Sequence, residues 1–168
     1  LGSEHPFTWG NVHQVAETVA SQGRYGEAER LFRRALSGRT RVLGNAHPDT
    51  LESADRLART LLEQGRASKA LASWEEVLEA LPTYFALGGT AGLETSGEVV
   101  GPILQRYLDA LIKSDAPDAA ARSFVAQSWL SFGRLDFALG DVAARRGAGD
   151  RPGAAALRSY QEARDALH

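Results

Sequence analysis

Hydrophobic residues recur along the first third of this chain with the spacing of amphipathic helices. Between residues 12 and 19 they fall at positions i, i+3, i+4 and i+7, which places them on one helical face. A second stripe with similar spacing follows between residues 28 and 36. Gly23 stands between the two stripes, and glycine favours the backbone conformation that ends a helix. The pattern predicts a pair of helices, whose core residues are Val12, Val15, Ala16 and Val19 in the first and Ala28, Leu31, Phe32, Ala35 and Leu36 in the second.

The whole pattern returns 42 positions further along the chain. Residues 1–6 (LGSEHP) correspond to residues 43–48 (LGNAHP), and residues 22–24 (QGR) correspond to residues 64–66 (QGR). A two-helix unit cannot bury both of its faces alone, so repeated units of this kind stack on their neighbours. The period therefore predicts a helical-repeat architecture.

A third, more distant unit follows an irregular stretch. Its Gly133-Arg134 pair stands where the second unit has Gly65-Arg66, and Trp129 lies on its predicted core stripe. The stretch between the units contains a glycine-rich segment, residues 87–92, which predicts a loop. A helix is expected from about Glu98 to Lys113, with Pro102 tolerated in its first turn.

These features predict an all-α fold without strands, a solenoid of about eight antiparallel helices with a glycine-rich insertion. We expect one domain, residues 1–168, and we divide it into five segments. They are repeat 1 (1–42), repeat 2 (43–84), an irregular insertion and helix (85–118), repeat 3 (119–149) and a capping helix (150–168).

The repeated motif resembles the tetratricopeptide repeat. In both units a Gly-Arg pair at a helix break precedes an alanine that lies four residues before a large aromatic, Phe32 or Trp74. The period of 42 and the linker Leu-Gly-x-x-His-Pro-x-Thr resemble the variant found in kinesin light chains and in bacterial regulatory proteins. The resemblance is strong over residues 1–84. It implies a scaffold whose first helices line a concave face that binds a protein or a peptide.

Two departures from that variant limit what the resemblance implies. The aromatic residue that usually lies late in the first helix is replaced by Val19 and Leu61. The paired asparagines of the inner helix correspond to residues 13–14 (HQ) and 55–56 (DR). The cargo binding of kinesin light chains is therefore not carried over to this chain.

The resemblance also indicates which residues would contact a partner, because they lie off the core stripe of each first helix. Their mixed charge favours a peptide held by several polar contacts, with Arg56 and Arg59 able to bind a carboxylate. The alternative is that these charges are merely solvated. The candidate residues are His13, Glu17, Asp55, Arg56, Arg59, Ser123, Phe124 and Gln127.

Charge and composition favour a protein partner over nucleic acid or a membrane. The 19 basic and 21 acidic residues give a net charge of −2 without a one-sided basic region. The arginines between residues 30 and 41 are interrupted by apolar residues, which predicts the solvated face of an amphipathic helix. No apolar run is long enough to span a bilayer, and the start of the chain lacks the features of a signal peptide.

The absence of cysteine excludes disulfides and thiolate zinc sites, and it fits a cytoplasmic location. Methionine is also absent, and arginine outnumbers lysine. We therefore expect a piece of a larger bacterial regulatory protein.

The sequence contains no motif that predicts catalysis, a metal or a cofactor. His5 and His47 precede proline at equivalent linker positions, which indicates turn geometry and capping. His13 and Glu17 are spaced as a helical surface pair, an arrangement that is common and weak. The glycines of residues 88–92 lack the Lys-Ser/Thr of a phosphate-binding loop. We expect no enzyme activity.

Two other functions remain as alternatives. The first is self-association through the ends of the solenoid, where Trp9 and Val12 would be exposed. The second, more remote, is an unrecognised enzyme centred on residues 85–118. Trp74 and Trp129 stand on predicted core positions, so we expect them to pack in the interior and not to stack on nucleic-acid bases.

Overall fold

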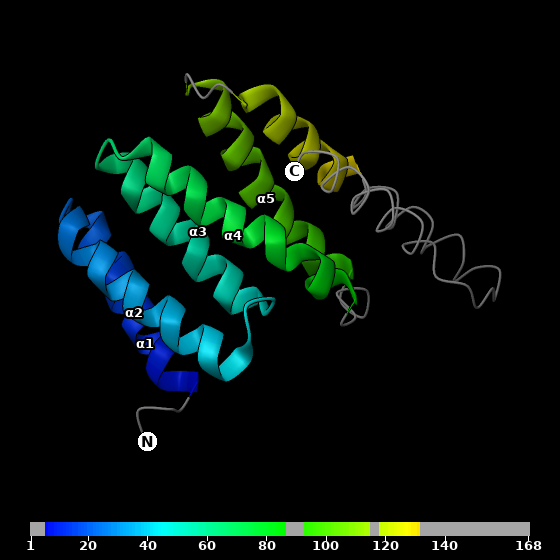
Figure 1. Cartoon of the computed structure of the whole chain (residues 1–168). Coiled ribbons are helices and arrows are strands. Elements are labelled where there is room, and N and C mark those ends of the chain that lie inside the picture. The colour runs from blue at the N-terminus through cyan, green and yellow to red at the C-terminus, as the bar shows by residue number, and fades with distance from the viewer. Residues whose placement is uncertain (1–5, 87–92, 115–117, 132–168) are drawn as a thin grey trace. The chain divides into compact units, whose positions relative to one another are not determined.

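The computed structural model describes residues 6–86, 93–114 and 118–131, and these residues form helices joined by short turns (Figure 1). The helices are α1 (Pro6–Ser21), α2 (Tyr25–Leu43), α3 (Pro48–Glu63), α4 (Ala67–Ala86), α5 (Leu93–Ile112) and a further helical segment over residues 119–131. No strand occurs in this part of the chain. The all-helical prediction is confirmed there, with six helices in place of about eight. The other two expected helices fall in residues 132–168, outside the described residues.

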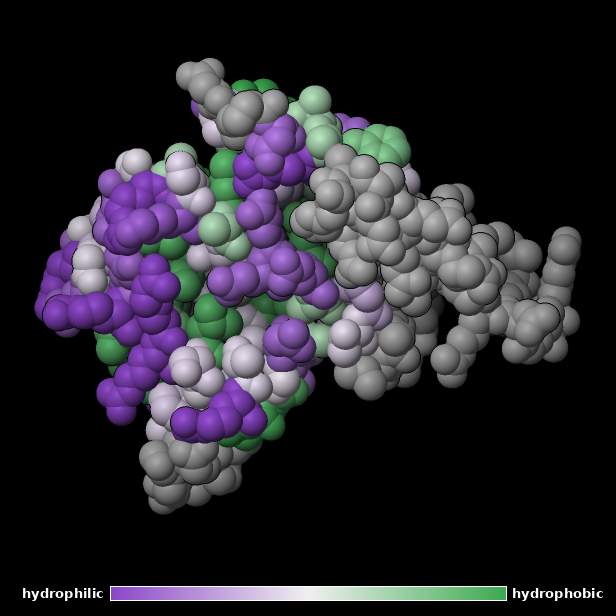
Figure 2. All heavy atoms as spheres, viewed as in Figure 1, coloured by the Kyte–Doolittle hydropathy of each residue, from purple (hydrophilic) through white to green (hydrophobic). Residues whose placement is uncertain are grey.

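The chain divides into two compact units, residues 1–89 and 90–168. In the first unit, α1 pairs with α2 and α3 pairs with α4, and the two pairs stack through contacts between α2 and α3 (Figure 1). Helix α1 also contacts α3 directly. Hydrophilic residues cover much of the unit's surface in Figure 2, while hydrophobic side chains show between the helices.

The turns between paired helices are built alike in both repeats. Gly23 and Gly65 have φ angles of 75° and 72°, a conformation that side chains disfavour. The next residue, Arg24 or Arg66, donates its backbone N–H to the carbonyl of Val19 (3.2 Å) or Leu61 (2.9 Å). This arrangement satisfies carbonyls at the helix end, and it explains why the Gly-Arg pair recurs.

His47 caps α3, as its position before proline predicts. The backbone N–H of Asp49 donates to His47 Nδ1 at 3.2 Å, and Pro48 occupies the first turn. His5, the equivalent residue of the first repeat, lies outside the described residues.

The predicted small-and-large pairing forms the core of the first unit. Ala28 and Ala70 are completely buried, and Phe32 and Trp74 are each 1% exposed. A small residue on each second helix therefore lets the helices approach, while the aromatic fills the space beside it.

The expectation for Trp9 was wrong, because this side chain is buried and not exposed at an open end. It packs on Gly38 of α2, where an added Cβ atom would overlap the indole ring. The guanidinium of Arg41 lies 6.0 Å from the centre of the ring. Val15 differs from its prediction in the opposite direction. The hydrophobic pattern predicts a core position, but the side chain is 52% exposed.

In the second unit, α5 begins at Leu93, earlier than predicted. Pro102 consequently lies inside the helix and not in its first turn. The proline removes one helical hydrogen bond, and its ring is exposed on the surface of α5. Trp129 of segment 119–131 is buried, as predicted. The glycine-rich segment 87–92, the Gly133-Arg134 turn and the proposed capping helix lie outside the described residues.

Candidate protein-interaction site

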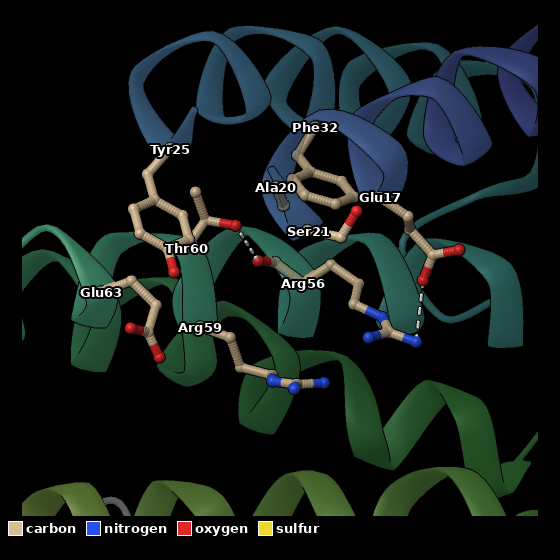
Figure 3. A pocket seen from close by; sticks show the side chains of 9 residues that line it. All are labelled: Glu17, Ala20, Ser21, Tyr25, Phe32, Arg56, Arg59, Thr60 and Glu63. Atoms are coloured by element: carbon tan, nitrogen blue, oxygen red, sulfur yellow. Dashed lines mark hydrogen bonds and ion pairs between the residues drawn. The ribbon is translucent and has the colours of Figure 1, made fainter. Parts of the chain in front are cut away.

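A pocket of about 280 Å³ opens on the first unit between α1 and α3 (Figure 3). Phe32 of α2 and Ala20 of α1 supply apolar surface, and Tyr25 adds an aromatic ring with a hydroxyl group. Its volume is near the lower limit for small-molecule sites, so it suits one or two side chains of a partner. We call it the α1–α3 pocket, and its lining residues are Glu17, Ala20, Ser21, Tyr25, Phe32, Arg56, Arg59, Thr60 and Glu63.

Glu17 and Arg56 form an ion pair across the pocket. Arg56 Nη2 lies 2.8 Å from Glu17 Oε1, so α1 and α3 are joined at this point (Figure 3). Both side chains are partly exposed. The hydroxyl of Thr60 donates a hydrogen bond of 2.8 Å to the backbone carbonyl of Arg56. This hydroxyl therefore points toward its own helix.

Arg59 and Glu63 line the same pocket without such a pairing. Both are exposed and lie one turn apart on α3. Neither makes an ion pair or a side-chain hydrogen bond with any residue that the structure describes. The pocket thus offers one cation and one anion that are free to interact with a partner.

His13 and Asp55, two further candidates, lie in the interior. His13 is 4% exposed and Asp55 is 3% exposed. Asp55 Oδ1 accepts a hydrogen bond of 2.9 Å from Trp74 Nε1. The ring of His13 meets Phe32 edge-on with centroids 5.3 Å apart. These two residues are therefore not available to contact a partner. The prediction of a surface pair of His13 and Glu17 was wrong, because His13 is buried and only the carboxylate of Glu17 is partly exposed.

His13 belongs to a buried polar cluster that joins the first three helices. Its Nδ1 lies 3.2 Å from Ser53 Oγ, and Arg39 donates to the same hydroxyl at 2.8 Å and to the carbonyl of Asp49 at 2.7 Å. Burial, and then the charge of Arg39, lower the pKa of His13 to about 4. The imidazole is consequently neutral at physiological pH.

The other predicted contacts, Ser123, Phe124 and Gln127, lie on segment 119–131 of the second unit. Phe124 is 63% exposed, Gln127 is exposed, and Ser123 is partly buried. The structure thus brings together Glu17, Arg56 and Arg59 of the candidate set, and it places the remaining residues elsewhere.

The described residues contain no group of histidine, cysteine and acidic side chains that could hold a metal ion. None of the described helices is long and apolar enough to cross a membrane.

A sequence model of the tetratricopeptide repeat matches residues 10–83. Residues 10–83 contain tetratricopeptide repeats. The matched segment spans all of α2 and α3 and most of α1 and α4, so the predicted family is confirmed for these residues of the first unit.

This chain is similar to a solved structure of nearly identical TPR-like repeats that are assigned to a kinesin light chain of Podosopora anserina. The structural alignment covers 97% of this chain and 93% of the other chain. The two are 19% identical, and the TM-score is 0.44. No protein of curated function matches the sequence significantly.

Tetratricopeptide repeats are generally protein–protein interaction modules, and their paired helices are typical of non-enzymatic scaffolds. The α1–α3 pocket lies on the first helices of both repeats, and three of the candidate contact residues, Glu17, Arg56 and Arg59, line it. The sequence reasoning missed Tyr25, Phe32 and Glu63 as lining residues. Tyr25 and Phe32 belong to α2, the second helix of their repeat, and their side chains line the pocket together with those of α1 and α3 (Figure 3).

Arg39 was also missed, because it was counted with the solvated arginines. The repeat could have predicted that Arg39 is buried, because Arg39 corresponds to Leu81, which is a core residue of the second repeat. A charged residue at a core position of a repeat indicates a buried polar cluster.

Proposed function

We propose that this chain binds a segment of a partner polypeptide in the α1–α3 pocket. In this proposal an apolar side chain of the partner packs against Phe32 and Tyr25, and an acidic group pairs with Arg59. The observation that carries the proposal is the free guanidinium of Arg59 at the edge of a partly apolar pocket.

The internal ion pair of the pocket explains why Arg59, and not Arg56, is the principal contact. Glu17 already neutralises Arg56 at 2.8 Å, so a ligand carboxylate would have to compete with it. No carboxylate pairs with Arg59 within the described residues, although Glu63 lies one turn away on α3. A charge-assisted contact to Arg59 therefore forms without breaking an existing one.

The remaining candidates extend the same proposal. Ser123, Phe124 and Gln127 are proposed contacts of the second unit. The chain is proposed to act within a larger cytoplasmic regulatory protein of bacterial origin, in keeping with its lack of cysteine and its arginine-rich composition.

A randomised peptide library displayed on phage provides the first test. Peptides that the native chain enriches are synthesised, and their dissociation constants are measured by fluorescence anisotropy. We expect acidic residues next to an apolar residue in the enriched set. The Arg59→Glu variant should weaken binding about tenfold or more, because a repulsive charge replaces an attractive one.

Lys69→Glu is the matched control. Lys69 is exposed on α4 and does not line the pocket, so the same reversal of charge should leave affinity unchanged. Circular dichroism establishes that both variants keep their helices. Equal affinity of the native chain and Arg59→Glu, or a library without any enriched peptide, would overturn the proposal.

A further inference from the structure

The outer helices of the two repeats carry opposite charges at equivalent positions. A shift of 42 residues places Arg33 and Arg34 of α2 on Glu75 and Glu76 of α4. The basic stripe on α2 is completed by Arg30 and the acidic stripe on α4 by Glu79. The fold therefore presents a basic helix and an acidic helix at corresponding places of one unit.

Four of these side chains have no partner of their own. Arg30, Arg34, Glu76 and Glu79 are all exposed, and none makes an ion pair or a hydrogen bond within the part of the chain that the structure describes. Arg33, in contrast, is held by Glu29 at 3.0 Å.

Each stripe also places like charges close together on its own helix. Arg30 and Arg34 are spaced i, i+4, and like charges at this spacing repel each other and destabilise an isolated helix. Within the described residues, Arg30, Arg34, Glu76 and Glu79 thus add no ion pair or side-chain hydrogen bond to their own helices.

We propose that the two stripes form an interface between two copies of this chain, with α2 of each copy facing α4 of the other. The two helices run in the same direction in Figure 1. A two-fold axis parallel to them and midway between them places each basic stripe opposite an acidic stripe. A two-fold axis across the helices would place like charges together, so complementarity selects the first arrangement.

A second copy fits this surface better than an unrelated partner does. An acidic protein would match the stripe on α2 and be repelled by the stripe on α4. A partner must present the inverse pattern at the same spacing, and a two-fold related copy does so by construction. The inference concerns a different surface from the α1–α3 pocket and does not depend on the proposed function.

The expected association is weak and sensitive to salt. Helices of 19 and 20 residues are about 30 Å long, which limits the contact to the lower end of specific interfaces. Exposed charges at about 0.5 M salt are screened over a few ångströms. We expect dimers at high protein concentration in about 50 mM salt, and an association at least tenfold weaker in about 500 mM salt.

Charge exchange combined with sedimentation velocity tests the interface. The variant Arg30→Glu/Arg34→Glu has two acidic stripes, and Glu76→Arg/Glu79→Arg has two basic stripes. Each variant alone should be a monomer, and an equimolar mixture should form a heterodimer. The chain with all four exchanges should form homodimers again, because the pattern is inverted but still complementary. Arg59→Glu, which changes a charge on α3 outside both stripes, should dimerise like the native chain.

The outcomes separate this interface from its alternatives. A monomeric native chain at low salt, or a four-fold variant that stays monomeric while its circular dichroism is native, would overturn the proposal. Dimers that persist in both double variants would place self-association on another surface and would also overturn it.

Discussion

Two buried polar side chains, His13 and Asp55, occupy equivalent positions of the two repeats. Each lies against the large aromatic of its own repeat, Phe32 for His13 and Trp74 for Asp55. The indole N–H of Trp74 needs an acceptor, which Asp55 supplies, whereas the ring of Phe32 needs none. The identity of the aromatic thus explains why an oxygen acceptor is required in one repeat and not in the other.

Replacing Asp55 should reveal this role as a loss of stability. Asp55→Ala removes the acceptor and leaves the indole N–H of Trp74 buried and unsatisfied, so we expect a loss of about 2–3 kcal/mol. Asp55→Asn keeps an oxygen acceptor and should cost less than half as much. Urea denaturation followed by circular dichroism compares the two variants. Equal losses in both would show that the hydrogen bond to Trp74 contributes little.

At the scale of the helix, α1 and α2 approach each other closely because of one glycine. Gly38 faces the indole ring of Trp9, and a methyl group there would overlap the ring. The equivalent residues of the second repeat are Ala80 in place of Gly38 and the smaller Leu51 in place of Trp9, and both are buried. A larger residue on one helix is thus matched by a smaller one on its neighbour.

Gly38→Ala should therefore destabilise the first unit despite the better helix propensity of alanine. Forcing Trp9 to move costs about 1–3 kcal/mol, which exceeds the gain of up to about 1 kcal/mol from propensity. Gly26→Ala in the same helix is the control, since its added methyl group meets nothing within 4 Å. It should leave stability unchanged or raise it slightly. Thermal unfolding measures both, and a Gly38→Ala variant as stable as Gly26→Ala would contradict the close packing.

The turns between paired helices and the core aromatics Phe32, Trp74 and Trp129 were predictable because they depend on local sequence. The Gly-Arg turns, the cap at His47 and the buried Trp74 follow from spacing and from the chemistry of single residues. Val15 and Arg39 were not placed correctly, because their burial depends on which helix lies beside them. Val15 corresponds to the buried Leu57 of α3, a helix that packs against α2. In the described residues no helix packs against α1 in the way that α2 packs against α3. Val15 is therefore exposed.

The candidate site was predictable only in part for a similar reason. Glu17, Arg56 and Arg59 share the pocket because α1 and α3 lie next to each other, as the repeat implies. The residues that interact with Arg56 and Asp55 come from other helices. Glu17 of α1 pairs with Arg56, and Trp74 of α4 donates a hydrogen bond to Asp55. No single-helix pattern could distinguish the free Arg59 from these neighbours.

At the scale of the first unit, a carboxylate joins the two repeats. Glu29 of α2 accepts a hydrogen bond from Gln64 (3.0 Å) and pairs with Arg66 (2.6 Å), both at the turn of the second repeat. Burial alone would raise the pKa of Glu29, but the hydrogen bonds from Gln64 and Arg33 and the charge of Arg66 hold it below its usual value. The Gln-Gly-Arg turn therefore has a second role, in which it fastens its repeat to the preceding one.

The buried His13 and the paired Glu29 together predict how stability depends on pH. The pKa of His13 falls from 6.5 to about 4 on folding, so the unfolded chain binds its proton more readily. Its contribution is complete above pH 6.5 and is lost as the pH falls toward 4, by at most about 3 kcal/mol. Glu29 acts in a lower window, because its pKa is lowered from 4.5 and its contribution is lost only below that pH.

Two variants separate these windows in urea denaturation between pH 8 and pH 3. His13→Asn retains a polar contact for Ser53 but does not titrate, so its free energy of unfolding should change much less than that of the native chain between pH 6.5 and 4. Glu29→Gln should keep the loss in that range and show a smaller further loss below pH 4.5. If His13→Asn retains the full native slope between pH 6.5 and 4, the histidine is already solvated in the folded chain. The polar cluster with Ser53 and Arg39 would then not be closed to water, and the junction between α1 and α3 would be looser than its hydrogen bonds indicate.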